Sequence, residues 1–322
     1  LGRIWPAERG VMGLRVCKYF RTELIEHFSS ILLAKKCHVE IGEDDLVRDF
    51  CRLSNLAVLL RWEGDFFEVS SLAQGMSECK ALAHLELSNT GVGDEGAHEL
   101  AGALKHARNL AYLDLSCNDI GDAGMSELAL VIEGSASLTH LDMSCNAISD
   151  EGASCLAAAL QECTALRLLE LSCNSIEAKG GGQLIQTLQD CTALTHLDLS
   201  CNSIGDEGAR RLTELLRQRT GLTHLGLSCN GISNDEAAAL GESLDVCSAL
   251  SHLDLSCNSL EDDGVRRLAV ALGDCTAITH LDLSGMQRGL GPSAAGSVAS
   301  MLGACTSLRH LDLSGNRIGD DG

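Results

Sequence analysis

The stretch LTHLDLSCNSIGDEG, residues 194–208, contains the pattern that decides the fold. Leu194, Leu197 and Leu199 are separated by polar residues, which is typical of a short strand with one buried face. A turn containing glycine and acidic residues follows. Leu212 and Leu216 then stand four residues apart, as a helix with one buried stripe requires. The stretch therefore predicts a strand, a turn and a helix in succession.

The same stretch recurs along the chain at a nearly constant interval. Its copies begin 28 residues apart seven times and then 30 residues apart. A weaker copy starts at Leu56, with Arg61 in place of a leucine. A period of this length is typical of a solenoid, in which each repeat packs on its neighbours. Positions are numbered from the first residue of each repeat, and these first residues are Leu82, Leu110, Leu138, Leu166, Leu194, Leu222, Leu250, Ile278 and Leu308.

Two further positions of the repeat are polar. Position 9 is asparagine in seven repeats, and we expect each amide to satisfy backbone groups of neighbouring turns. Acids and serines such as Asp206 and Ser149 precede the helix, and we expect them to cap its free N–H groups. One repeat departs from this pattern, because Met286 stands at position 9 and two extra residues follow. We expect a bulged loop and a missing amide there.

The repeat resembles the leucine-rich repeat family in its L-x-x-L-x-L-x-x-N-x-L pattern, which runs through residues 56–322. The 28-residue unit is similar to the ribonuclease-inhibitor-like class, which includes repeats of NOD-like receptors and of the Ran GTPase activator. The resemblance implies an α/β solenoid, a horseshoe with a parallel sheet on its concave side and helices on its convex side. It assigns residues 53–322 to this solenoid, with one degenerate and nine regular repeats. The last repeat stops before its helix, so we expect a further cap downstream of Gly322.

The charge is distributed unevenly along the chain. The formal net charge is −21, and the first 80 residues hold 11 of the 24 basic and 12 of the 45 acidic side chains. Nearly all of the negative charge therefore falls on the repeats, which excludes nucleic acid and anionic membranes as expected partners. No signal peptide or spanning segment is evident. We expect an intracellular, cytoplasmic protein.

Three columns of side chains are expected on the concave face, because positions 3, 5 and 7 point away from the buried leucines. Position 3 is His84, Tyr112, His140, Leu168, His196, His224, His252, His280 and His310. Position 5 is Glu86, Asp114, Asp142, Glu170, Asp198, Gly226, Asp254, Asp282 and Asp312. Position 7 is serine in all nine repeats. The sequence thus predicts a histidine column, an acid column and a serine column.

These columns do not predict catalysis. Residues two apart on a strand lie about 6 to 7 Å apart, which is beyond the reach that a nucleophile and its base need. Structural zinc sites converge from different elements on one point, whereas these columns are linear. We therefore expect no catalytic residue, no metal and no cofactor.

The candidate partner-binding residues are those of the columns and of their breaks. Uniform columns cannot fix the register of a ligand, but breaks such as Tyr112, Leu168 and the neighbouring Arg167 can, and aromatic and arginine side chains are common interface anchors. The acid column predicts a protein partner with a basic surface. The full candidate set is Tyr112, Arg167, Leu168, His140, His196, His224, His252, His280, Asp114, Asp142, Asp198, Asp254 and Asp282.

Twelve of the 16 cysteines follow the repeat. One column stands at position 8 and the other just before each new strand. Neighbouring strands are about 4.8 Å apart, which is wider than the usual Cβ separation of a disulfide. We expect reduced, half-buried thiols that serve packing. The columns are Cys117, Cys145, Cys173, Cys201, Cys229 and Cys257, and Cys79, Cys163, Cys191, Cys247, Cys275 and Cys305.

Residues 1–52 do not follow the repeat. Val11, Leu14, Cys17 and Phe20 fall on one helical stripe, so a small helical segment is expected. The string PAERGVMGLRVCKYFR resembles the second half of an F-box, with Pro6 opening a helix and with Val16, Cys17 and Phe20 matching the adaptor-binding core. The alternative is a helical cap on the solenoid.

Three functions remain open for this noncatalytic interaction module. The F-box resemblance implies the substrate-recognition subunit of a cullin-type ubiquitin ligase. The repeats alone are equally consistent with a scaffold or assembly subunit. The repeat class also implies an inhibitor or GTPase regulator similar to the ribonuclease inhibitor or the Ran activator. The oligomeric state stays open.

Overall fold

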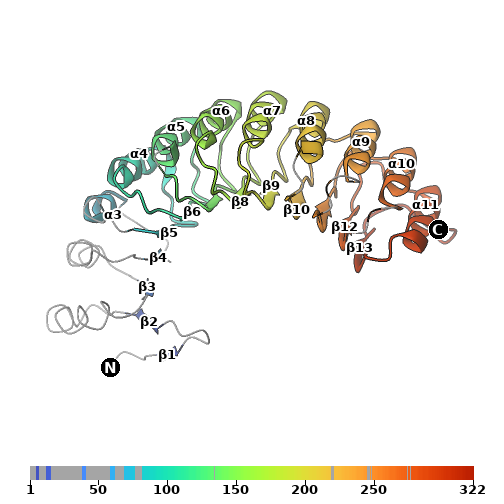
Figure 1. Cartoon of the computed structure of the whole chain (residues 1–322), viewed down its shortest axis with the longest axis horizontal. Helices are drawn as coiled ribbons and strands as arrows, with labels where there is room; N and C mark the ends of the chain where they lie inside the picture. Colours follow the sequence, from blue (N-terminus) through green and yellow to red (C-terminus); the bar gives the residue numbers. More distant parts are fainter. Residues whose placement is uncertain are drawn as a thin grey trace. The chain divides into compact units, whose positions relative to one another are not determined.

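Each regular repeat except the last folds as a three-residue strand followed by a helix, as its pattern of leucines predicts (Figure 1). The computed structural model describes residues 82–322 except 134, 219–220, 245–246, 248, 274 and 276, together with one helix and four short strands before residue 82. The chain divides into two units, Leu1–Ala147 and Ile148–Gly322.

The first unit contains the strands β1 to β7 and the helices α3 to α5 among its described residues. The strands are β1 (Trp5–Pro6), β2 (Met12–Arg15), β3 (His38–Glu40), β4 (Leu59–Arg61), β5 (His84–Glu86), β6 (Tyr112–Asp114) and β7 (His140–Asp142). The helices are α3 (Val69–Met76), α4 (Gly93–Leu104) and α5 (Asp122–Glu133).

The second unit continues the alternation. Its strands are β8 (Leu168–Glu170), β9 (His196–Asp198), β10 (His224–Gly226), β11 (His252–Asp254), β12 (His280–Asp282) and β13 (His310–Asp312). Its helices are α6 (Asp150–Leu160), α7 (Ala178–Thr187), α8 (Gly205–Gln218), α9 (Asn234–Ser243), α10 (Asp262–Gly273) and α11 (Pro292–Ala304). Within this unit the strands form one layer, and the helices α7 to α11 lie along one side of that layer (Figure 1).

Strand β1 is antiparallel to β2, and the strands that follow in each unit pair in parallel. In the regular repeats equivalent positions lie opposite each other. In the second unit Leu197 of β9 pairs with Leu225 of β10, which pairs with Leu253 of β11. These leucines are 1–3% exposed, and the leucines and isoleucines that follow them in the same repeats are also buried. Burying each such side chain contributes about 1.5–3 kcal/mol. The predicted α/β solenoid with a parallel sheet is thus confirmed in the described repeats.

The position-9 asparagines connect each repeat to the one before it. In the second unit the amide oxygen of Asn202 accepts the N–H of Ile176 at 3.0 Å, and its Nδ2 donates to the carbonyls of Leu171 at 2.9 Å and Leu199 at 3.0 Å. Equivalent bonds recur at Asn118, Asn146, Asn230 and Asn258. The predicted amide ladder is therefore confirmed.

The ladder is interrupted only locally at Met286. This side chain is buried, and the two extra residues fall in a loop where Gly285 and Gly289 have φ of 61° and 72°. The amide of Asn316 in the next repeat accepts the N–H of Leu290 at 3.0 Å, so the pattern resumes at once. The predicted bulge and missing amide are both observed.

The acids at the start of the helices form a second ladder, which differs from the prediction. The Oδ1 atom of Asp150 accepts the N–H of Glu177 at 2.8 Å, and that of Asp206 accepts the N–H of Ser233 at 2.9 Å. Each acid thus caps the helix of the following repeat instead of its own. Ser149 does cap its own helix, since its hydroxyl accepts the N–H of Glu151 at 3.4 Å. The sequence prediction missed the first arrangement because the recipient lies 27 residues away.

The N-terminal prediction is wrong where the structure describes it. Leu14, expected on a helical stripe, lies in β2 and pairs with Val39 of β3, while Pro6, expected to open a helix, lies in β1. The apolar centre of the MGLR segment matches the strand pattern of the repeats, and pairing with β3 outweighs the helical spacing. Val11, Val16, Cys17 and Phe20 lie outside the described residues.

Candidate binding face

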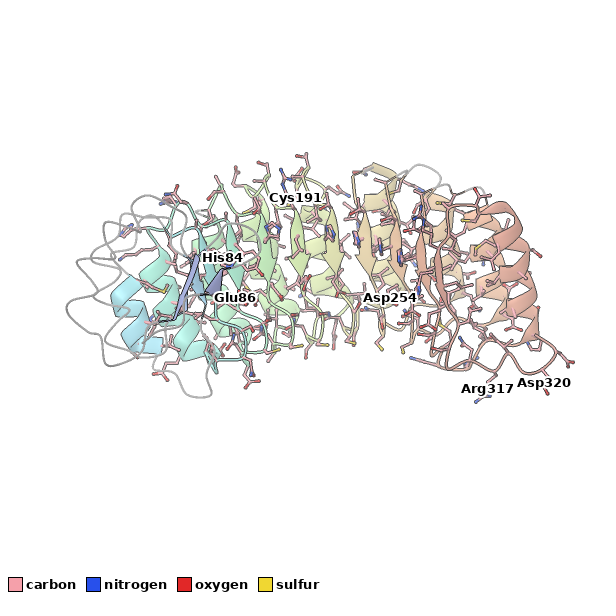
Figure 2. The ribbon with its side chains drawn as sticks, turned by 90° about the horizontal axis from the view of Figure 1, so that it is seen from below. His84, Glu86, Cys191, Asp254, Arg317 and Asp320 are labelled. Carbon is pink, nitrogen blue, oxygen red and sulfur yellow. The ribbon has the colours of Figure 1, made fainter. Side chains whose placement is uncertain are left out.

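The side chains at positions 3 and 5 lie on the open face of the strands. In β9, β11 and β12 the residues at both positions are half-buried, whereas the leucine between them is buried. The face opposite the core carries His84, Glu86 and Asp254 among the labelled side chains of Figure 2. The predicted alternation of a buried leucine with face-exposed polar side chains is therefore confirmed, and it brings the candidate residues of each unit onto one surface.

The position-3 residues form a column of stacked rings in each unit. In the second unit, the ring centroids of His196 and His224 are 4.0 Å apart, those of His224 and His252 are 3.9 Å apart, and those of His252 and His280 are 4.0 Å apart. Neighbouring planes differ by 11–16°. The rings are therefore in van der Waals contact across four repeats.

Tyr112 takes part in the ring column of the first unit. Its ring stacks on His84 at 3.9 Å and on His140 at 5.5 Å. Leu168 is half-buried at the equivalent position of β8 and pairs with His196, while the neighbouring Arg167 is exposed. Both predicted breaks thus lie on the face, but Tyr112 preserves the stacking and Leu168 ends it.

A hydroxyl lies beside Nδ1 in five histidines of the column, His140, His196, His224, His252 and His280, and it indicates which ring nitrogen carries the proton. The Thr223 hydroxyl donates its single hydrogen to the carbonyl of Thr195 at 2.9 Å, and the same oxygen lies 2.8 Å from Nδ1 of His224. The oxygen must therefore accept from an Nδ1–H group, which leaves Nε2 as the acceptor of the neutral ring. Ser251 and Thr279 make the same two contacts for His252 and His280.

Burial disfavours the charged form of three histidines of the ring column. Burial, together with repulsion from His196, His252 and His280, lowers the pKa of His224 to about 4. Burial lowers the pKa of His196 as well, and burial with the charges of neighbouring histidines lowers that of His252. At neutral pH these three rings are therefore uncharged, and they do not offset the negative charge of the acid column.

We expect the ring column to make stability depend on pH. An unfolded histidine titrates near pH 6.5, so between about pH 6.5 and pH 4 the unfolded chain binds protons that folded His224 does not. The free energy of unfolding should fall by about 2 kcal/mol across this window after allowance for solvent screening. Urea unfolding at a series of pH values measures this change.

His224→Gln should remove much of that pH dependence, while His98→Gln should not. His98 lies on the exposed side of α4, 3.4 Å from Glu127, and outside the ring column. Asp254 acts in the opposite direction, since burial raises the pKa of its carboxyl. Equal pH profiles for the wild type and His224→Gln would show that the stacked rings do not govern this dependence.

The aspartates of the acid column have a structural role that the sequence analysis missed. The Oδ1 atom of Asp198 accepts the N–H of Ser200 at 2.8 Å, and Asp282 accepts the N–H of Ser284 at the same distance. Asp114, Asp142 and Asp254 form the equivalent bond, and the first two also accept from the serine hydroxyl. Each aspartate thus closes the turn after its strand. This role accounts for one oxygen of each carboxylate, and no protein partner is needed to explain it.

Gly226 leaves a notch in the acid column. A Cβ atom at this position would lie 2.3 Å from Oδ1 of Asp198 and 2.9 Å from the hydroxyl of Ser200. The Asp198 carboxylate therefore leans over the glycine, and an acidic side chain at 226 would require this carboxylate to move. The glycine thus leaves a gap in the column that the side chain of its neighbour occupies.

The cysteine columns differ from the prediction in their burial. The cysteines before the strands are buried, whereas most cysteines at position 8 are exposed. Only the column before the strands therefore serves packing. The position-8 cysteines lie in turns that project beyond the ends of the strands. None of the twelve described cysteines forms a disulfide, and Cys79 lies outside the described residues.

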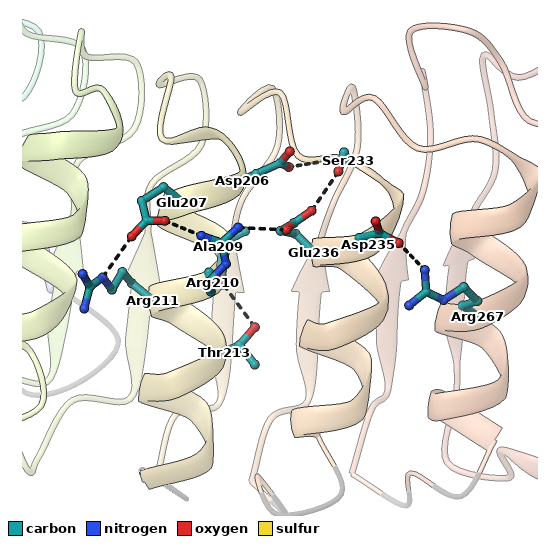
Figure 3. Close-up of polar contacts among 10 residues, drawn as sticks. All are labelled: Asp206, Glu207, Ala209, Arg210, Arg211, Thr213, Ser233, Asp235, Glu236 and Arg267. Carbon is teal, nitrogen blue, oxygen red and sulfur yellow. Dashed lines mark hydrogen bonds and ion pairs between the residues drawn. The ribbon is translucent and has the colours of Figure 1, made fainter.

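The helix side carries basic residues that are already paired. Arg210 pairs with Glu207 and, at 3.3 Å, with Glu236, and Arg211 lies 3.3 Å from Glu207 (Figure 3). Arg267 pairs with Asp235 on the neighbouring helix. Exposed pairs of this kind contribute at most about 1 kcal/mol each. In contrast, positions 3, 5 and 7 of the strand face contain no lysine or arginine in any of the nine repeats.

In the described part of the chain, no group of three or more histidine, cysteine, aspartate or glutamate side chains is placed to hold a metal ion. No helix among the described residues is long and apolar enough to cross a membrane.

Comparison with known proteins identifies the repeats. The model of the Leucine Rich repeat family matches residues 78–101, 106–129, 134–157, 190–212, 246–269 and 304–322. No curated protein matches the chain. The matched segments coincide with the strand–helix units described above. The chain therefore contains leucine-rich repeats and folds as a leucine-rich-repeat solenoid, an architecture that indicates a protein-interaction module.

Proposed function

We propose that the chain binds a protein partner with a basic surface through the open face of its strands. The observation that carries this proposal is the composition of that face. It combines a column of carboxylates with a column of stacked rings, three of which have lowered pKa values, and its three outward positions hold no lysine or arginine. Such a face attracts cationic surfaces and repels anionic ones.

The proposed anchors are the residues at which the columns change. Leu168 offers an apolar side chain beside His196, and Arg167 is exposed next to it. Tyr112 offers an aromatic ring, but it also stacks on His84 and His140, so its replacement affects the column as well as the partner. Leu168 is therefore the sharper probe of binding.

We expect Leu168→Ala to weaken partner binding by about 2 kcal/mol, or about thirtyfold, if Leu168 is an anchor of the interface. The partner would first be identified by cross-linking to the full chain, and its affinity would then be measured by titration. Affinity should also fall as the salt concentration rises, because the attraction is electrostatic.

Arg210→Ala is the matched control, because Arg210 lies on the helix side and pairs with Glu207 and Glu236. It should leave the affinity unchanged. If Leu168→Ala has no effect and Arg210→Ala abolishes binding, the partner binds the helices and the proposal fails.

The narrower functions named from the sequence stay proposals. The role in a cullin-type ubiquitin ligase depends on Val16, Cys17 and Phe20, which lie outside the described residues, and the strand at Met12–Arg15 does not favour it. A pull-down of the ligase adaptor by the full chain, compared with a Val16→Asp variant, tests it directly. The scaffold and the regulator of the ribonuclease-inhibitor or Ran-activator type use the same binding face and differ only in the partner. A reducing, cytoplasmic location is supported by the free cysteines.

A further inference from the structure

Position 8 of every regular repeat has a left-handed backbone. At this position φ is 53–57° in the six cysteines and 55° in Asn89, and it is 61° and 67° in Gly285 and Gly315. Glycine and asparagine tolerate this region well, whereas other residues with a Cβ atom adopt it at a cost. The chain therefore uses the favoured residues in three repeats and cysteine in six.

Packing does not compensate for this cost. Five of the six position-8 cysteines are exposed and Cys257 is half-buried, in contrast to the buried cysteines that precede the strands. An exposed thiol in a left-handed turn gains little from burial. Residues held in unfavourable conformations at a surface point to a function for the side chain.

The position-8 residues of neighbouring repeats lie side by side. The N–H groups of Cys173, Cys201 and Cys229 donate to the carbonyls of Ser200, Ser228 and Ser256, which directly precede position 8 of the next repeat, at 2.8, 2.7 and 3.0 Å. The side chain of Cys257 extends toward the following repeat, since its Sγ lies 2.9 Å from the place that a Cβ atom would take on Gly285. We call Cys173, Cys201, Cys229 and Cys257 the thiol ladder.

Two thiols of the ladder have raised pKa values. Partial burial and the hydrogen bonds from neighbouring thiols raise the pKa of Cys201 to about 12. Burial, the Cys229 thiol and the carboxylates of Asp254 and Asp282 raise the pKa of Cys257. Thiols in this state react slowly with peroxides and disulfides, because the thiolate is the nucleophile. Redox sensing is therefore a poor match for the ladder, whereas a soft metal ion can displace the protons.

We propose that the thiol ladder binds thiophilic, two-coordinate metal ions of the Cu(I) class, each ion held between the sulfurs of two adjacent repeats. A linear row offers two sulfurs at a time, and the described residues contain no convergent set of three ligands that zinc would need. Thiolates favour Cu(I), zinc and iron–sulfur clusters, and of these only Cu(I) is satisfied by two sulfurs. Cys117 and Cys145 offer the same arrangement in the first unit, where their side chains also interact.

The binding step is an exchange of protons for the metal. One Cu⁺ ion replaces the hydrogens of two thiols, two copper–sulfur bonds form, and two protons leave to solvent without any change in oxidation state. Because two protons are released for each ion, the affinity should fall about one hundredfold for each unit of pH below neutral.

The test is an anaerobic titration of the full chain with Cu(I), supplied as its acetonitrile complex and in competition with the chelator bicinchoninate. The test variant carries Cys173→Gly, Cys201→Gly, Cys229→Gly and Cys257→Gly. Glycine suits the left-handed turn, so this variant should melt at or above the temperature of the wild type. The matched control carries Cys247→Ala and Cys275→Ala, which removes two buried thiols outside the ladder.

We expect the wild type and the control to take Cu(I) from the chelator, with one ion for each pair of ladder thiols, and X-ray absorption to show two sulfur ligands. The glycine variant should lose these ions. The proposal is overturned if the glycine variant retains them, if the wild type cannot compete with the chelator and so holds an adventitious ion only, or if Zn²⁺ binds in preference.

Discussion

Replacing Asn258 by alanine should lower the free energy of unfolding by about 4 kcal/mol, because each buried backbone group left unpaired costs about 1–3 kcal/mol. The Asn258 side chain is fully buried. Its Nδ2 donates to the carbonyls of Leu227, Leu255 and Ser256, and its Oδ1 accepts the N–H groups of Asn230 and Ile232. Alanine leaves all of these groups without the amide. Urea unfolding followed by circular dichroism measures the loss.

Asn316→Ala is the matched control for this prediction. Asn316 makes the same kind of bonds, with its Nδ2 donating to Leu283 and Leu313 and its Oδ1 accepting from Leu290. It is half-buried, so water can replace the amide. We expect Asn316→Ala to lower the free energy of unfolding by about 1 kcal/mol, which is the net contribution of an ordinary hydrogen bond. Equal losses for the two variants would mean that burial does not set the cost.

Replacing Gly180 by alanine should destabilise the chain by about 3 kcal/mol, at the upper end of what overpacking costs. A Cβ atom on Gly180 would lie 2.5 Å from Cα of Asp150 and 2.6 Å from its Oδ1. The first of these is a backbone atom, which cannot move aside without shifting helix α6. The same carboxylate caps the N–H of Glu177, so its displacement also removes that bond. Thermal and urea unfolding both report the effect.

Gly182 provides the control in the same helix. The atom nearest to a Cβ at this position is Cγ of Arg211, at 3.9 Å, which is an ordinary contact. Alanine is a better helix former than glycine, so Gly182→Ala should stabilise the chain by about 0.5–1 kcal/mol. If Gly180→Ala lowers and Gly182→Ala raises the free energy of unfolding, the difference is due to the close approach of α6 and α7 at Gly180. If both variants are stabilised, α6 moves aside more easily than the packing indicates.

Much of the fold followed from residues that repeat with strict spacing. Each leucine at positions 1, 4 and 6 has the same role in nearly every repeat, and so has the asparagine at position 9. One structural prediction for each position therefore held for nearly all repeats. Positions 3 and 5 lie on the open face for the same reason. The place of Tyr112 and Leu168 on the face was predicted, but the ring contacts of Tyr112 were not, because stacking depends on side-chain angles.

Three features did not follow from the pattern, each for its own physical reason. The left-handed backbone at Cys201 depends on the geometry of the turn, and only Asn89, Gly285 and Gly315 at the same position hinted at it. The cap from Asp150 to Glu177 crosses between repeats. The helical spacing around Leu14 fits a helix locally, but β2 is formed by pairing with β3, which a local pattern does not report.

The two ladders of polar bonds give neighbouring repeats equivalent interfaces. Asn202 and Asn230 contact their preceding repeats through the same atoms, and Asp150 and Asp206 contact the following repeats in the same way. A 28-residue unit that carries both the asparagine and the acid could be deleted or duplicated, and its new junction would form the same bonds as the old one. The unit that contains Met286 lacks the asparagine, and the unit that begins at Leu166 has Ala178 at the position of Asp150 and Asp206. The length of this solenoid can therefore change by recombination without a new interface wherever both residues are present.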